Sequence, residues 1–234
     1  MTLHNTLLIL LLSAWSLQLD AQSFSEALAA ANNNLEAQTA LGYNIEYLSY
    51  SGNTVSTSSN MRVEKLNGTT YTQLDNMESY HFGNTRVVVD HAGKSILLNK
   101  GELSQSATNG IEQQLALLQA LEAQASEVRS EALEGSTRYT LSFVASEFRE
   151  LVVEVNTTTG LFERLLLVPQ TPIAGAMLTS DAPVTAFEVR VSTYEPELKA
   201  LSKPLTEYLV KRGDQHQLQP TYSNYQYAHY YDPQ

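Results

Sequence analysis

Few residues of this sequence stand at the spacings that catalysis or metal binding requires. His81 and His91 belong to no i, i+4 or His-x-His pair, the spacings that bring imidazoles to one metal ion. A site that joins either histidine to Asp90 and Glu78 through the tertiary structure stays open beside the alternative of solvated polar side chains. No Gly-x-Ser-x-Gly elbow, phosphate-binding glycine loop or calcium-loop spacing occurs. We therefore predict no catalytic residue, no metal site and no cofactor.

Two further groups of residues have types that could do chemistry. Glu150 and Glu154 share one face of a predicted strand; acid–base catalysis would need them desolvated in a cleft, and a solvated outer face explains them better. Alternating tyrosines near the end of the chain could stack on sugar or lipid, or could be ordinary strand residues. They are Tyr222, Tyr225, Tyr227, Tyr230 and Tyr231. Neither group supplies a nucleophile and its base, so we predict that the protein is not an enzyme.

Length and composition set the class of protein. The 234 residues, 43% hydrophobic and 17% charged, are typical of a folded globular chain that can bury the core of one domain. The net charge of −11 repels nucleic-acid phosphate and anionic headgroups at long range, so we predict no nucleic-acid partner. Because cysteine is absent, the chain has no disulfide, no thiol nucleophile and no thiolate metal site.

The first residues have the pattern of an export signal. Thr6 to Leu19 is an apolar run of signal-peptide length, too short to span a bilayer comfortably, and a polar stretch of small residues follows it. We predict a signal peptide over residues 1–21, cleavage after Ala21 and no membrane span in the mature periplasmic protein; a retained anchor is the alternative. With no cysteine after the run, lipid attachment of the bacterial lipoprotein type is excluded.

The elements that would position a site are mostly short strands. A helix is predicted from Phe24 to about Ala40, with an N-cap at Ser23 or Ser25. From Tyr43 to Leu98, alternating segments separated by turns such as Asn67-Gly68 predict a meander of antiparallel strands. Such a meander presents one face to a core, so the amphipathic helix has a surface to cover.

The second half repeats this order. A second amphipathic helix is predicted from about Ile111 to Ala125, and a hairpin turns at Asn156 to Gly160. The remaining predicted elements are a strand over Thr185 to Thr193, a short helix near Glu197 to Ser202, a strand near Thr206 to Lys211 and a last strand near Tyr222 to His229.

This order resembles the periplasmic lipoprotein carriers and receptors of the LolA/LolB-like superfamily, from about Phe24 to Thr193. The segments that carry the resemblance are NMRVEKLNGTTYTQL, TRVVVDHAGKSILL and LVVEVNTTTGLFERLLL. The resemblance implies an α+β fold in which a strongly curved antiparallel half-barrel sheet holds amphipathic helices on its concave face. We expect one such domain over residues 22–234, with 196–234 as a tyrosine-rich C-terminal extension.

The resemblance also implies a function: an outer-membrane-directed lipoprotein carrier or a periplasmic protein that holds a lipid, a lipoprotein acyl chain or another apolar ligand in a hydrophobic cavity. Each candidate residue could instead be ordinary core. The candidates for the cavity wall are Tyr43, Ile45, Tyr47, Met61, Val63, Leu141, Phe143, Phe187 and Val189, with Ile173, Met177 and Leu178 at its rim. The alternative is a cell-envelope module with a filled core that docks another envelope protein through a strand edge or the tyrosine tail.

Overall fold

The structure is a computed structural model that describes residues 23–100, 118, 120–173, 183–212 and 215–231. The predicted signal peptide, residues 1–21, lies outside these ranges. Most of the predicted helix over 111–125 lies outside them as well, although its last turn, residues 120–124, is described and is helical. No described helix combines the length and apolar character that crossing a bilayer requires.

The first helix confirms the prediction made from its capping residues. Helix α2 (Phe24–Ala37) begins after Ser23, whose hydroxyl accepts from the backbone N–H of Glu26 at 3.2 Å, while the Glu26 carboxylate accepts from the Ser23 N–H at 2.9 Å. This reciprocal pair satisfies two donors that a helix start leaves open. Along the helix, Phe24, Leu28 and Ala31 are buried at one-turn spacing, so a single apolar stripe faces the sheet.

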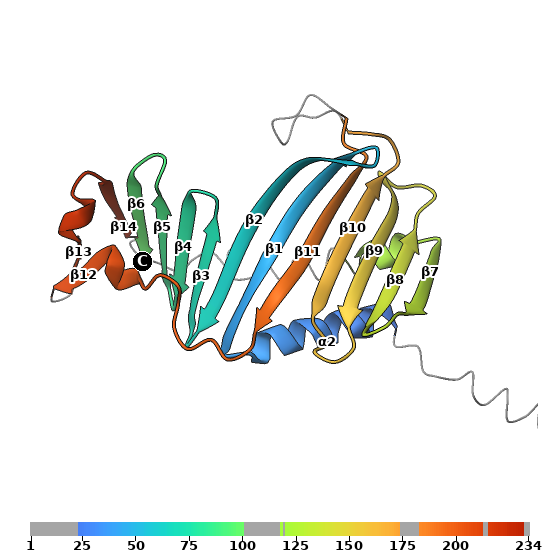
Figure 1. Ribbon diagram of the computed structural model, residues 1–234, viewed down its shortest axis with the longest axis horizontal. Coiled ribbons are helices and arrows are strands. Elements are labelled where there is room, and N and C mark those ends of the chain that lie inside the picture. The colour runs from blue at the N-terminus through green and yellow to red at the C-terminus, as the bar shows by residue number, and fades with distance from the viewer. Residues whose placement is uncertain (1–22, 101–117, 119, 174–182, 213–214, 232–234) are drawn as a thin grey trace, which may run out of the picture.

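In the part of the chain that the structure describes, twelve strands form one sheet in the order β14-β6-β5-β4-β3-β2-β1-β11-β10-β9-β8-β7. Neighbours are antiparallel except β14 and β6, which are parallel. The two outermost of these described strands, β14 and β7, do not pair with each other, so the sheet is open, as the predicted antiparallel half-barrel requires (Figure 1). The strands are β1 (Ala40–Ser51), β2 (Thr54–Leu66), β3 (Thr69–Leu74), β4 (Met77–Phe82), β5 (Thr85–Asp90), β6 (Ser95–Lys100), β7 (Glu127–Ala132), β8 (Ser136–Ser142), β9 (Phe148–Asn156), β10 (Phe162–Pro169), β11 (Ala186–Glu195) and β14 (Gln226–Tyr231).

The C-terminal segment differs most from the sequence prediction. The predicted helix over Glu197 to Ser202 is wrong: this stretch is not helical, and the Ser202 N–H instead donates to the buried Glu64 carboxylate at 2.6 Å. Because a 3-10 turn, η1, occupies Leu205–Glu207, the strand predicted near Thr206 begins later, as β12 (Leu209–Arg212). This strand pairs with β13 (Gln215–Leu218). After η2 (Pro220–Tyr222), the last strand joins the main sheet as β14.

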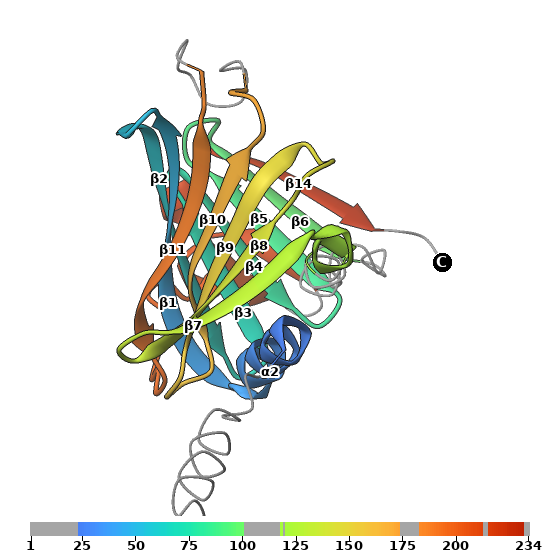
Figure 2. The same ribbon diagram turned by 90° about the vertical axis from the view of Figure 1, so that its right-hand side faces the viewer.

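One hydrophobic core lies between α2 and the strands β8 and β9. Phe24 and Leu28 of the helix pack against Tyr139, Leu141 and Val153, all of them buried. Successive side chains of a strand point to opposite faces, so the sheet has two distinct sides. We call the side that carries Leu141 and Val153 the helix face, and the other side the opposite face (Figure 2).

A second core lies on the opposite face, at the other end of the sheet. Tyr71, Tyr80 and Val87 of β3, β4 and β5 are buried there with Tyr208 and Leu209 of the C-terminal segment. The register relates the two cores, because Glu64 of β2 pairs with Tyr71 and therefore shares the opposite face, whereas its neighbour Val63 lies on the helix face. The buried side of the sheet therefore changes at β2, from the helix face on the β8 and β9 side to the opposite face on the β3 to β5 side.

Truncating Leu28 to alanine is expected to lower the free energy of unfolding by about 2–5 kcal/mol, because the side chain is fully buried between helix and sheet. Urea denaturation followed by circular dichroism measures this change. The matched control is Val144→Ala, at a side chain that is 81% exposed, which should change stability by no more than about 0.5 kcal/mol. Equal effects of the two substitutions would contradict the placement of α2 on the sheet.

Candidate functional site

The structure brings most of the predicted cavity residues to one side of the sheet. The register aligns Tyr47 with Val189 and Ile45 with Met61, and the alternation of side chains places the rest of the strand residues beside them. The predicted residues that share the helix face are Tyr43, Ile45, Tyr47, Met61, Val63, Leu141, Phe187 and Val189. Phe143 directly follows β8 and is buried in the core under α2.

These residues differ in how far they are covered. Leu141 and Phe143 are buried by α2, and Val63 is also buried, so these three contribute to the core. Tyr43, Ile45, Met61, Phe187 and Val189 are only half-buried, and Tyr47 is 37% exposed. The apolar surface that remains accessible therefore lies on β10, β11, β1 and β2, next to the core that the helix covers.

Cross-strand pairing arranges this surface in rows. Val191 of β11 lies beside Ile45, which lies beside Met61, and the same row continues through Leu74 of β3 to Met77 of β4. Exposure increases along the row, to 38% for Leu74 and 50% for Met77. A second row joins Leu165 of β10 to Val189 and Tyr47. Paired side chains on one face are direct neighbours, so the rows form one contiguous apolar surface.

The sequence analysis missed five members of this surface, and their signal was present. They are Leu74, Met77, Leu165, Leu167 and Val191. Leu165 and Leu167 stand in a run of leucines in which every second residue faces one side, a pattern that also fits a strand buried on both faces. The predicted rim is only partly described: Ile173 forms a bridge with Val184 and is 42% exposed, whereas Met177 and Leu178 lie outside the described residues.

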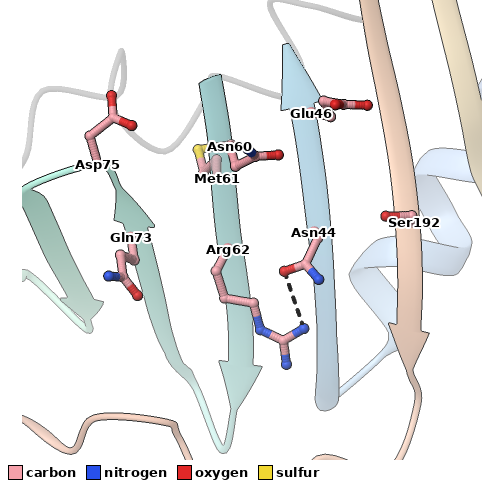
Figure 3. Close-up of a pocket in the computed structure, with 8 residues that line it drawn as sticks. All are labelled: Asn44, Glu46, Asn60, Met61, Arg62, Gln73, Asp75 and Ser192. Atoms are coloured by element: carbon pink, nitrogen blue, oxygen red, sulfur yellow. Dashed lines mark hydrogen bonds between the residues drawn. The ribbon is translucent and has the colours of Figure 1, made fainter. Parts of the chain in front are cut away.

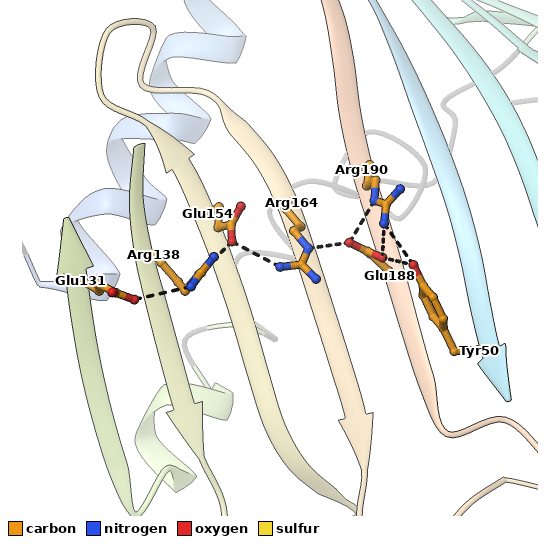
Figure 4. A network of polar contacts seen from close by, with 7 residues as sticks. All are labelled: Tyr50, Glu131, Arg138, Glu154, Arg164, Glu188 and Arg190. Atoms are coloured by element: carbon orange, nitrogen blue, oxygen red, sulfur yellow. Dashed lines mark hydrogen bonds and ion pairs between the residues drawn. The ribbon is translucent and has the colours of Figure 1, made fainter. Parts of the chain in front are cut away.

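The opposite face of the same strands is charged. A ladder of ion pairs crosses β7, β8, β9, β10 and β11, with acidic and basic side chains in alternation (Figure 4). Its contacts are Arg138 Nε to Glu154 Oε1 at 2.8 Å, Arg164 Nη1 to Glu154 Oε1 at 3.3 Å and Arg190 Nη2 to Glu188 Oε2 at 2.9 Å. Glu154, one of the two carboxylates considered for acid–base catalysis, is therefore paired with two arginines.

Glu188 is the most enclosed member of the ladder, with 1% of its side chain exposed. Burial alone would raise the pKa of this carboxyl, but hydrogen bonds donated by Arg190, Tyr50 and Arg164 outweigh burial and lower the pKa to about 2. Glu188 is therefore ionised at neutral pH and holds the three donors in place. Its role here is structural, because every part of the carboxylate is engaged.

A hollow of about 660 Å³ on the opposite face lies over β1, β2 and β3 and has a polar lining (Figure 3). Asn44, Glu46 and Gln73 point into it beside Arg62, whose guanidinium also pairs with Glu64 and Glu195. Amide, carboxylate and guanidinium groups favour water or a polar solute over an acyl chain. The hollow is therefore distinct from the apolar surface on the helix face.

The structure places His91 beside Glu78, a contact that the sequence analysis left open. The contact belongs to a hydrogen-bond network that holds the fold together. The Glu78 carboxylate accepts from Lys203 Nζ at 2.6 Å, from the Tyr208 hydroxyl at 2.8 Å and from His91 Nε2 at 3.0 Å. Burial would raise the pKa of Glu78, and these hydrogen bonds outweigh burial and lower it. His81 lies on the other side of the sheet. Within the described ranges, no three His, Asp or Glu side chains gather as metal ligands would.

The C-terminal tyrosines are largely part of the fold. Tyr222, Tyr225 and Tyr227 pack against the second core, and the Tyr225 hydroxyl is 2.9 Å from His91 Nδ1. Tyr230 is 61% exposed on β14. The alternative of ordinary strand residues is thus confirmed for Gln226–Tyr231.

No protein-family model and no curated protein matches this sequence. Among solved structures, the chain is similar to an uncharacterized conserved protein from Thermus thermophilus, with 9% identity, a TM-score of 0.48 and coverage of 89% of this chain and 100% of that one. It is similar to a LolA superfamily protein from Nitrosomonas europaea, with 10% identity, a TM-score of 0.29 and coverage of 75% and 93%. It is also similar to the Mycobacterium tuberculosis lipoprotein LppX, with 12% identity, a TM-score of 0.38 and coverage of 74% of this chain and 96% of that one.

Replacing Glu188 by glutamine is expected to lower the free energy of unfolding at pH 7 by roughly 1–3 kcal/mol, because the buried carboxylate loses its charge-assisted hydrogen bonds. A carboxyl whose pKa is about 2 in the folded protein against an ordinary 4.5 stabilises the fold above pH 4.5, and this contribution is lost as the pH falls from 4.5 toward 2. The variant should therefore show a flatter dependence of stability on pH in that window.

The control for this experiment is Glu127→Gln on β7, where an exposed pair with Arg129 at 3.4 Å should contribute no more than about 1 kcal/mol. Chemical denaturation at pH 7, 4 and 3 compares the two variants with the native chain. An unchanged slope in the Glu188 variant would show that the ladder does not hold this carboxylate in its ionised form.

Proposed function

We propose that this chain is an exported periplasmic binding protein or carrier that holds a lipid, a lipoprotein acyl chain or another apolar ligand against the helix face of its sheet. One observation carries the proposal. Half-buried and exposed apolar side chains form contiguous rows over β10, β11, β1 and β2, beside the core that α2 forms with β8, β9 and β10.

A surface of this kind needs an occupant for physical reasons. Apolar area removed from water contributes roughly 25 cal/mol per Å², and contiguous apolar patches of several hundred Å² on soluble proteins usually mark binding sites. An open sheet cannot close over its own apolar side, so helices or a ligand must cover that side. An acyl chain fits because it requires no hydrogen-bond partner.

In the arrangement that we propose, the helix face is the concave side of a half-barrel, and α2 together with residues 120–124 lies across part of it. Leu141, Phe143 and Val63 form the packed floor. The ligand lies beside them on Tyr43, Ile45, Tyr47, Met61, Phe187 and Val189, extended by Leu165, Leu167 and Val191, with Ile173, Met177 and Leu178 as its rim. The export proposal rests on the apolar run from Thr6 to Leu19 and the polar residues that follow.

Protein purified from a bacterial periplasm and analysed by native mass spectrometry is expected to carry a mass beyond that of the polypeptide. The apo protein, prepared by delipidation, should increase the fluorescence of a hydrophobic dye, and oleic acid should displace the dye, because both compete for the same apolar rows. A bare polypeptide mass together with no response to dye or fatty acid would contradict the proposal.

Tyr47→Asp is expected to weaken dye and fatty-acid binding at least about tenfold, because the ligand would have to desolvate a carboxylate, at a cost above about 1.4 kcal/mol. Val55→Asp is the matched control: Val55 is 46% exposed on the neighbouring strand, and its pairing with Tyr50 places it on the opposite face. Titration of both variants, after a check of thermal stability, distinguishes the faces. Equal losses would place the ligand elsewhere.

A further inference from the structure

A row of basic side chains crosses the helix face beside the apolar surface. Lys65 of β2 pairs with Thr70 of β3, which pairs with His81 of β4, and His81 pairs with Arg86 of β5. The row continues to Asn99 and then to Tyr230. Directly paired residues have Cβ atoms about 5 Å apart. Three basic groups therefore stand within one stretch of four neighbouring strands.

The basic row contains no acidic residue. On the opposite face, Arg138, Arg164 and Arg190 are each paired with carboxylates. In contrast, the ion pairs formed within the described ranges involve neither Arg86, which is exposed, nor His81. In addition, His81 Nε2 is a buried ring nitrogen without a hydrogen-bond partner among the described atoms. Within the described ranges, Arg86 is therefore exposed without a carboxylate partner, and the His81 ring beside it keeps one nitrogen that no described atom engages.

The distance from this basic row to the apolar row of Met61, Leu74 and Met77 matches the length of an acyl chain. Lys65 and Met61, Thr70 and Leu74, and His81 and Met77 are each four residues apart on their strands, which is about 14 Å at about 3.4 Å per residue. One leaflet of a bilayer is about 15 Å of hydrocarbon. Between the two rows lie aliphatic and small hydroxyl side chains: Val63, Thr72, Ser79, Val88 and Leu97.

We propose that the ligand is an anionic amphiphile, a lipid with a phosphate headgroup. The phosphate contacts Arg86 and His81 with Lys65 nearby, and an acyl chain runs along β2 to β4 toward Met61, Leu74 and Met77. This inference rests on the proposed function and names its ligand class. The net charge of −11 opposes the approach of an anion at long range. At physiological salt, however, charges more than about 8 Å apart are largely screened, so the nearby basic side chains determine the energy of contact with the phosphate.

The test uses the full mature chain and two lipids with identical dioleoyl chains. Apo protein is incubated with vesicles of phosphatidylglycerol or of phosphatidylcholine, the vesicles are removed by size exclusion, and the lipid retained per protein is measured by mass spectrometry. We expect at least about tenfold more phosphatidylglycerol than phosphatidylcholine, with a preference that declines as salt is raised. Arg86→Gln should reduce the preference several-fold, and the double variant with His81→Gln should abolish it.

Arg212→Gln, an exposed arginine on β12 that makes the same change of charge, should leave the preference unchanged. Equal retention of both lipids by native protein and by Arg86→Gln would overturn this inference and leave the proposed function standing. Retention of neither lipid, together with no response to dye or oleic acid, would overturn both. Preference for oleic acid over phosphatidylglycerol, or binding to vesicles without any lipid retained, would overturn the phosphate assignment.

Discussion

The structure depends on one constraint: an open sheet of twelve strands has two faces, and each part of it must hide its apolar side somewhere. Residues of β8 and β9 are covered by α2 on the helix face, whereas those of β3, β4 and β5 are covered by the C-terminal segment on the opposite face. The buried side must therefore change between these regions. At the change, around β1 and β2, neither cover extends fully over the apolar residues of the helix face.

Buried carboxylates hold the C-terminal segment and the charged face in place on the sheet. Glu64 and Glu78 accept hydrogen bonds from Ser202, Lys203 and Tyr208, so both fix the C-terminal segment on the sheet. Glu188 fixes the ladder of ion pairs on the other half. Buried ion pairs contribute little net stability over apolar packing, yet an unpaired member is costly, so such groups specify one arrangement of the chain.

The same division explains why the proposed ligand site and the polar hollow do not coincide. Along β1, the side chains of Tyr43, Ile45 and Tyr47 alternate with those of Asn44 and Glu46, so one strand supplies an apolar surface on the helix face and a polar lining on the other. The contiguous apolar rows on these strands therefore lie on the helix face. The basic row of Lys65, His81 and Arg86 borders that surface and distinguishes its two ends by charge.

Local signals in the sequence determined much of this fold. The capping residues before α2, the turn at Asn156 to Gly160 and the alternation from Tyr43 to Leu98 each specify short-range structure, and each is observed. Alternation also assigned the cavity candidates of β1, β2, β8 and β11 to a common face. What alternation cannot give is which face a distant segment covers, because that depends on contacts between residues more than a hundred positions apart. The burial of Glu64 and Glu78, the place of β14 beside β6 and the alignment of Lys65, His81 and Arg86 were therefore decided only by the tertiary pairing of strands.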